Sequence, residues 1–91
     1  MDTPKLIEQI CDDVKRLLLR KNQKYGDSAL NPCRIFSKAN NVEQLLIRID
    51  DKLSRITNNG FDGDSDEDTL NDLIGYLVLL KVALGRETKG Q

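Results

Sequence analysis

The segment LIGYLVLLKVAL, residues 73–84, decides the fold of this 91-residue chain. It contains no proline, Lys81 is its single charge, and no polar stripe remains for a helix to turn toward water. A helix that is hydrophobic on all sides needs cover on several faces. Two other helices of so short a chain cannot supply that cover, so the sequence predicts a homo-oligomer in which a second copy completes the core.

Around this segment the sequence predicts a helix over residues 65–84. Ser65 is a suitable N-cap, and acidic residues follow it in the first turn, where the helix dipole favours negative charge. Gly85 is suited to ending the helix. The remaining residues, 86–91, are therefore expected to form a frayed tail.

Two amphipathic helices are predicted before it, over residues 3–25 and 41–57. Thr3 is the expected N-cap of the first, and Asn41 is that of the second, with Gln44 completing a capping box. In both, apolar residues recur at the helical intervals of three and four. They are Leu6, Ile7, Ile10, Val14, Leu17 and Leu18 in the first helix, and Val42, Leu45, Leu46, Ile49, Leu53 and Ile56 in the second.

These elements predict an all-α chain of one domain, residues 1–91, built as an oligomeric bundle of three main helices. A connection separates the first two helices and contains Pro32, which disfavours helix at the residue before it. A short extra turn near residues 32–36 is compatible with the sequence.

Composition excludes several functions. The chain has no histidine, so histidine metal sites, catalytic triads and histidine bases are ruled out. A net charge of −1 argues against a duplex nucleic-acid partner, and the lack of a long apolar run argues against a membrane partner. Cys11 and Cys33 are expected to be buried free thiols in a cytoplasmic protein.

Charge is segregated along the chain. Residues 15–38 hold seven basic side chains against one acidic side chain, whereas all six charges in residues 60–74 are acidic. A solvated basic helix end and a solvated acidic loop are the ordinary explanation. The alternative is a phosphate site where Lys21, Asn22 and Lys24 meet a glycine turn. Tyr25 then either stacks on a base or plugs the space under the loop.

Asp72 is predicted at the edge of the core, where an unpaired carboxylate would be costly. It needs a cation from the second helix (Arg48, Lys52 or Arg55) or a bound Mg²⁺. Asp68 lies one turn earlier on the same face, and Glu67 with Asp50 or Asp51 completes an oxygen-rich shell suited to Mg²⁺. An ion-pair network between the helices and a metal site both remain open.

Three motifs resemble a known family: KNxxYGD at residues 21–27, RxDDKxxRI at 48–56 and EDxxxDLxxY at 67–76. Together they resemble the small phage and bacterial nucleotide-modification-associated domain, which is similar in turn to the MazG-like all-α nucleoside triphosphate pyrophosphohydrolases. The resemblance implies Mg²⁺-dependent cleavage between the α- and β-phosphates. Carried over to this chain, it places Asp68 and Asp72 among the metal ligands.

The chain departs from the enzyme pattern in two places. Asp68 and Asp72 are four residues apart where the enzymes space their acids by three, and the enzymes' Glu-x-x-Glu on the second helix is absent. Three hypotheses follow: a pyrophosphohydrolase, a nucleotide-binding protein without turnover, such as a phage protein that sequesters a cyclic signalling nucleotide, and a structural oligomer. The candidate ligand-binding residues are Lys21, Asn22, Lys24, Tyr25, Arg48, Lys52 and Arg55, and the candidate metal ligands are Asp51, Glu67, Asp68 and Asp72.

Overall fold

The computed structural model describes residues 2–31, 35, 37–60 and 64–89. This part of the chain forms three helices and no strand: α1 (Thr3–Tyr25), α2 (Asn41–Asn59) and α3 (Asp64–Lys89). The predicted all-α class and the three main helices are therefore confirmed. The extra turn expected near residues 32–36 lies largely outside the described residues.

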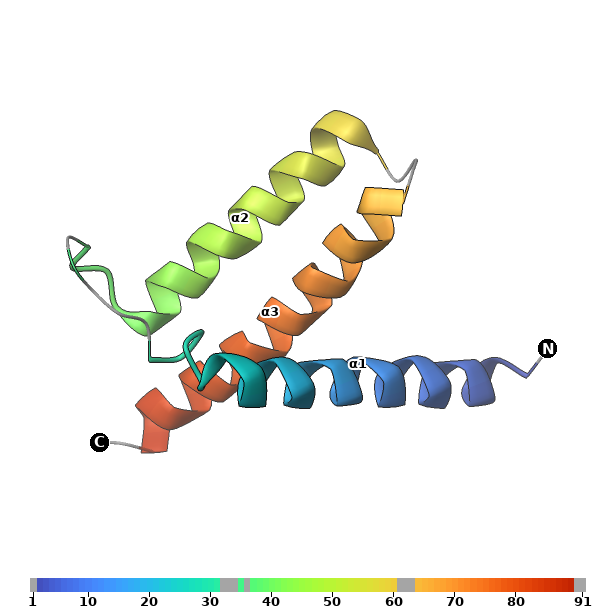
Figure 1. Cartoon of the computed structure of the whole chain (residues 1–91), viewed down its shortest axis with the longest axis horizontal. Helices are drawn as coiled ribbons and strands as arrows, with labels where there is room; N and C mark the ends of the chain where they lie inside the picture. The colour runs from blue at the N-terminus through green and yellow to red at the C-terminus, as the bar shows by residue number, and fades with distance from the viewer. Residues whose placement is uncertain (1, 32–34, 36, 61–63, 90–91) are drawn as a thin grey trace.

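Helices α2 and α3 form a pair, and α1 crosses that pair. Helices α2 and α3 run antiparallel side by side, and most contacts between helices are theirs (Figure 1). Helix α1 crosses α3 near the C-terminal end of α1, while its N-terminal half extends away from the other two helices (Figure 1). The described chain is accordingly elongated, with extents of 45 × 31 × 24 Å.

Helix α1 begins one residue earlier than its predicted cap implies. Asp2 occupies the N-cap position with extended backbone and makes no side-chain cap bond, so the expectation that Thr3 is the cap is wrong. At the other end, Gly26 adopts the left-handed conformation (φ 62°, ψ 39°), and its N–H donates to the Asn22 carbonyl. This glycine ends the helix after Tyr25, as the sequence predicts.

Helix α2 is capped by Asn40 and not by the predicted Asn41. The backbone of Asn40 is extended, which lets its Oδ1 accept a hydrogen bond from the Glu43 N–H at 2.8 Å. Because Asn41 is not the cap, the predicted capping box of Asn41 and Gln44 is wrong, and Gln44 Nε2 donates to the Ala39 carbonyl at 3.4 Å. The helix continues to Asn59, two residues beyond the predicted end.

Helix α3 passes through Gly85 and continues to Lys89, so the predicted stop at Gly85 and the frayed tail after it are wrong. Among the described residues, the glycines with positive φ are Gly26 and Gly60. A glycine inside a helix costs only about 1 kcal/mol relative to alanine. A glycine can therefore end a helix or lie within one.

The core is small and lies where α2, α3 and the turn after α1 meet. Leu30, Leu45 and Ala83 are buried together, and the side chains packed against them are Val42, Tyr76, Leu79 and Leu80. Helix α1 contributes no buried residue. Cys11, on the apolar stripe of that helix, is free and exposed, so its predicted burial is wrong within the single chain. Cys33 lies outside the described residues.

Many large apolar side chains remain exposed. In α1, Ile7 and Ile10 are 56% and 57% exposed. In α3, within residues 73–84, the exposed large apolar side chains are Leu77, Val78, Val82 and Leu84. Self-association remains a prediction, and these faces are where it would take place. None of the described helices combines the length and the apolar character needed to cross a membrane.

Candidate functional site

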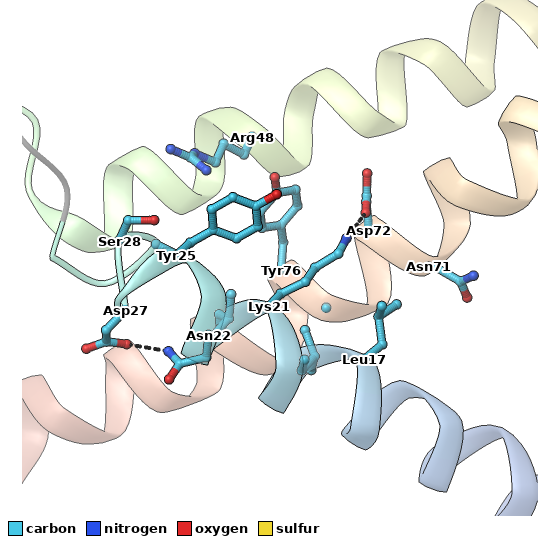
Figure 2. A pocket seen from close by; sticks show the side chains of 14 residues that line it. Leu17, Lys21, Asn22, Tyr25, Asp27, Ser28, Arg48, Asn71, Asp72 and Tyr76 are labelled. Carbon is cyan, nitrogen blue, oxygen red and sulfur yellow. Dashed lines mark hydrogen bonds and ion pairs between the residues drawn. The ribbon is translucent and has the colours of Figure 1, made fainter.

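A cavity of about 370 Å³ opens where the C-terminal end of α1 meets α2 and α3 (Figure 2). Its volume falls within the roughly 300–1,000 Å³ typical of small-molecule sites. The side chains around it are of three kinds, apolar, aromatic and polar. The lining residues are Leu17, Leu18, Lys21, Asn22, Tyr25, Asp27, Ser28, Ala29, Arg48, Asn71, Asp72, Gly75, Tyr76 and Leu79.

The turn after α1 forms one wall of this pocket and is held by Asp27. This residue has a positive φ of 62°, directly after the left-handed Gly26. Its carboxylate accepts hydrogen bonds from Asn22 Nδ2 at 2.8 Å and from Asn31 Nδ2 at 2.7 Å. Its carbonyl accepts from the N–H groups of Leu30 and Asn31. Asp27 thereby ties the last turn of α1 to Asn31 and to Leu30, which is buried in the core.

Two tyrosine side chains line the pocket. Tyr25 comes from the end of α1 and Tyr76 from α3, and Figure 2 shows both among the side chains around the cavity. Tyr25 is 59% exposed and therefore does not plug the space under the loop. Each ring has a cation above it: Lys24 Nζ lies 5.4 Å from the Tyr25 centroid, and Arg48 Cζ lies 5.9 Å from the Tyr76 centroid.

Asp72 connects all three helices. Its Oδ1 lies 3.3 Å from Lys21 Nζ of α1, and its Oδ2 lies 3.2 Å from Lys52 Nζ of α2. The predicted ion pair with a cation of the second helix is therefore present, with Lys52 as the partner. The Lys52 side chain is only 13% exposed, so this ammonium group depends on the carboxylate more than an exposed lysine would.

The register of α2 against α3 explains both the Lys52–Asp72 ion pair and the contact of Arg48 with Tyr76. Because the helices are antiparallel, the step of one turn from Arg48 to Lys52 matches the step from Tyr76 back to Asp72. Lys52 therefore meets the carboxylate while Arg48 meets the ring. No carboxylate of the described residues lies within ion-pair distance of Arg48, so its guanidinium remains available to an anion.

The structure brings together some of the predicted ligand-binding residues and separates others. Lys21, Asn22, Tyr25 and Arg48 line the pocket. Lys24 lies against Tyr25, and Lys52 reaches the site through Asp72. Arg55 does not line the pocket and pairs with Asp51 at 3.3 Å.

The structure describes the side chains of two of the four predicted metal ligands, Asp51 and Asp72. Asp72 contacts two lysines, and Asp51 pairs with an arginine. The side chains of Glu67 and Asp68 lie outside the described part of the chain. Among the residues that the structure does describe, no group of three or more acidic or cysteine side chains is placed to hold a metal ion.

Several pocket residues were missed by sequence reasoning. Tyr76 had a detectable signal, because it follows Asp72 by one helical turn and must share its face. Asp27 belongs to the KNxxYGD motif but was not named as a site residue, and Ser28 and Ala29 gave no comparable signal. They reach the pocket because two consecutive residues with positive φ fold the chain back after α1.

No protein-family model, no curated protein and no solved structure matches the chain. The resemblance to nucleotide-modification-associated and MazG-like proteins therefore stays a hypothesis. Evidence for a function therefore comes from the residues of the pocket.

Proposed function

We propose that the protein binds a phosphorylated nucleotide in the pocket between α1, α2 and α3. The observation that carries this proposal is that Tyr25 and Tyr76 line one cavity, with Arg48 above the Tyr76 ring. Aromatic faces suit a base, and an arginine that forms no ion pair with a carboxylate of the described side chains suits a phosphate.

The base would stack on the exposed ring of Tyr25. Stacking of a base on an aromatic side chain contributes about 1–3 kcal/mol and does not depend on which base is present. Asn22 of α1 and Asn71 of α3 also line the cavity, and their amide groups offer donors and acceptors to a base edge. Asn22 donates to the Asp27 carboxylate, so its amide group is already oriented.

The phosphate would bind Arg48 and Lys21. The Arg48 guanidinium can donate two parallel hydrogen bonds to phosphate oxygens. Lys21 shares Asp72 with Lys52, so Lys21 can turn to a phosphate while Lys52 continues to neutralise the carboxylate. The lysine side chain of Lys21 is 48% exposed and has room for this change.

We favour binding without turnover over Mg²⁺-dependent hydrolysis. A hydrolase would need Asp72 as a metal ligand, yet each of its oxygens faces a lysine ammonium group. On α2, neither Asp50 nor Asp51 lines the cavity, and Asp51 pairs with Arg55. A protein that captures or senses a nucleotide agrees with both observations.

The test is incubation with a panel of linear and cyclic nucleotides, with and without Mg²⁺, followed by mass analysis of free and protein-bound ligand. The expected result is an intact nucleotide in the protein fraction, with or without the metal. Accumulation of a monophosphate and pyrophosphate only with Mg²⁺ would establish the hydrolase instead. An empty protein fraction across the panel would contradict nucleotide binding.

Two arginine variants of α2 locate the ligand. Arg48→Ala removes a pocket cation, and we expect affinity to fall at least tenfold, or about 1.4 kcal/mol. Arg55→Ala is the matched control, because this arginine lies on the same helix outside the cavity lining. Equal losses in the two variants, measured by calorimetry, would place the ligand elsewhere.

A further inference from the structure

Exposed leucines of α2 and α3 lie on the side of this helix pair that faces away from the pocket. Four of them, each between 41% and 47% exposed, are called the back face here: Leu46 and Leu53 of α2, and Leu70 and Leu77 of α3. None of the four lines the cavity. Large apolar side chains gathered on one surface of a small protein indicate a contact with a partner.

The back face is separate from both the pocket and the place where α1 packs. On α2, Leu46 is two residues from Arg48, which lines the pocket. On α3, Leu77 is two residues from Gly75, and Gly75 is where Leu18 of α1 packs. Two residues span about 200° around a helix, so these leucines point nearly opposite to the pocket and to α1. A partner can therefore reach the back face without displacing α1 or a ligand.

The register of α2 against α3 sets the level of each residue along the pair. It is fixed by two contacts, Lys52 with Asp72 and Arg48 with Tyr76. Because the helices are antiparallel, each step along α2 matches an equal step backwards along α3. The residues that come level by this count, to within one residue, are Leu53 with Leu70, Leu46 with Leu77, and Glu43 with Lys81.

Glu43 and Lys81 are opposite charges beside the back face. Glu43 is one turn before Leu46 and Lys81 is one turn after Leu77, so each charge shares the side of its helix with a leucine of the back face. Both are exposed, and neither forms an ion pair with a described side chain.

The two charges are level but do not meet within one chain. Glu43 is two residues from Leu45, and Lys81 is two residues from Ala83. Leu45 and Ala83 are buried in the core between the helices. Glu43 and Lys81 therefore point away from the contact between α2 and α3, and each is available to a partner.

We propose that a second copy of this chain covers the back face, about a two-fold axis parallel to α2 and α3. This axis lays α2 of each copy on α3 of the other at the same level. Leu46 then packs on Leu77 of the other copy and Leu53 on Leu70, so the contact is isologous. The proposal does not depend on a ligand in the pocket.

Charge selects both the occupant and the axis. One chain carries an acid on α2 and a base on α3 at the same level, so its surface is complementary to itself after this rotation. Glu43 of each copy then meets Lys81 of the other, and both pairs form at once. A two-fold axis perpendicular to the helices would lay α2 on α2 and α3 on α3, which leaves the two charges on different helix pairs.

The apolar contact is tested by Leu46→Asp, with Ile47→Asp as the matched control. The two residues are neighbours on α2 and are 43% and 61% exposed, but Ile47 lies about 100° further around the helix, away from α3. In light scattering at micromolar concentration, we expect the unmodified chain and Ile47→Asp to associate. Leu46→Asp should lose that association step with unchanged helical circular dichroism, and Leu77→Asp repeats the test from α3. A monomeric unmodified chain, or equal behaviour of Leu46→Asp and Ile47→Asp, overturns the proposal.

Charge pairing is tested by Glu43→Lys and Lys81→Glu. Each change places like charges across the contact twice, because of the two-fold symmetry, and should weaken association about tenfold. Mixed in equal amounts, the two variants again have opposite charges at both contacts and should form a heterodimer as strong as the unmodified dimer. Sedimentation velocity measures all three samples. A mixture that associates no better than the single variants contradicts the pairing.

The axis is tested by disulfide cross-linking in a Cys11→Ser and Cys33→Ser background. One variant carries Leu46→Cys and the other carries Leu77→Cys. Under mild oxidation, the mixture should yield more covalent dimer than either variant alone, because α2 of one copy lies on α3 of the other. Preferential cross-linking of the Leu46→Cys variant with itself would show that α2 lies on α2 and overturns the proposed axis.

Discussion

Lys52 Nζ lies 3.2 Å from Asp72 Oδ2, while the other oxygen of the same carboxylate faces Lys21. This relationship joins α2 to α3, and through Lys21 it also holds the C-terminal half of α1. Few other contacts attach α1, since none of its residues is buried. The geometry of the pocket therefore depends on one half-buried carboxylate.

Replacement of Asp72 by Asn should destabilise the chain. The change leaves Lys52 with a nearly buried, uncompensated charge, and we expect a loss of about 1–3 kcal/mol, below the full cost of a buried pair because Asp72 is 28% exposed. The measurement is urea unfolding at constant m-value. Asp51→Asn is the control, because this exposed i,i+4 pair with Arg55 should change stability by less than about 0.5 kcal/mol. Equal effects would mean that Asp72 contributes no more than a surface ion pair.

Replacement of Gly75 by Ala should disturb the pocket more than it changes stability. The new methyl group forces the Leu18 side chain to move, at a cost of about 1–3 kcal/mol. Part of this cost is offset by the roughly 1 kcal/mol by which alanine favours a helix over glycine. Because Leu18 and Gly75 both line the cavity, ligand affinity should fall. Addition of Leu18→Ala should relieve the clash, and a failure of the double variant to recover affinity would argue against this contact as the cause.

Asp27 should respond differently to Gly and to Ala. Glycine keeps the positive φ of 62° and removes only the carboxylate, whereas alanine adds backbone strain of about 1–2 kcal/mol. Both changes free the Asn22 amide, so ligand affinity should fall in both. Chemical unfolding should show Asp27→Ala to be the less stable variant. Equal stability would mean that the left-handed conformation is not kept.

Tyr25 should matter for binding and not for stability. It is 59% exposed, so Tyr25→Leu should change the free energy of unfolding by no more than about 0.5 kcal/mol. The same variant should lose about 1–3 kcal/mol of nucleotide affinity through lost stacking, while Tyr25→Phe keeps most of it. Calorimetric titration of the two variants tests this. Unchanged affinity in Tyr25→Leu would remove the stacking role.

The sequence alone determined the elements that local physics controls. The period of three and four in the stripes predicted three helices, and Gly26 ended α1 where a left-handed residue is needed. The incorrect predictions concern the residues at which the helices begin and end. Asn40 and Asn41 are equally suited to capping, and the choice depends on which of them has extended backbone. A helix can end at Gly85, but here residues 86–89 continue α3 beyond it.

Only the tertiary structure decided which distant side chains share the pocket. The sequence could predict that Asp72 needs a cation, but it left Arg48, Lys52 and Arg55 as alternatives. The antiparallel register of α2 on α3 selected Lys52 and left Arg48 above Tyr76. Lys21 is 51 residues from Asp72, and its contact depends on how α1 crosses α3. Helical periodicity determines the face on which a residue lies, whereas register and crossing angle, set by the packing of the whole chain, determine what that face meets.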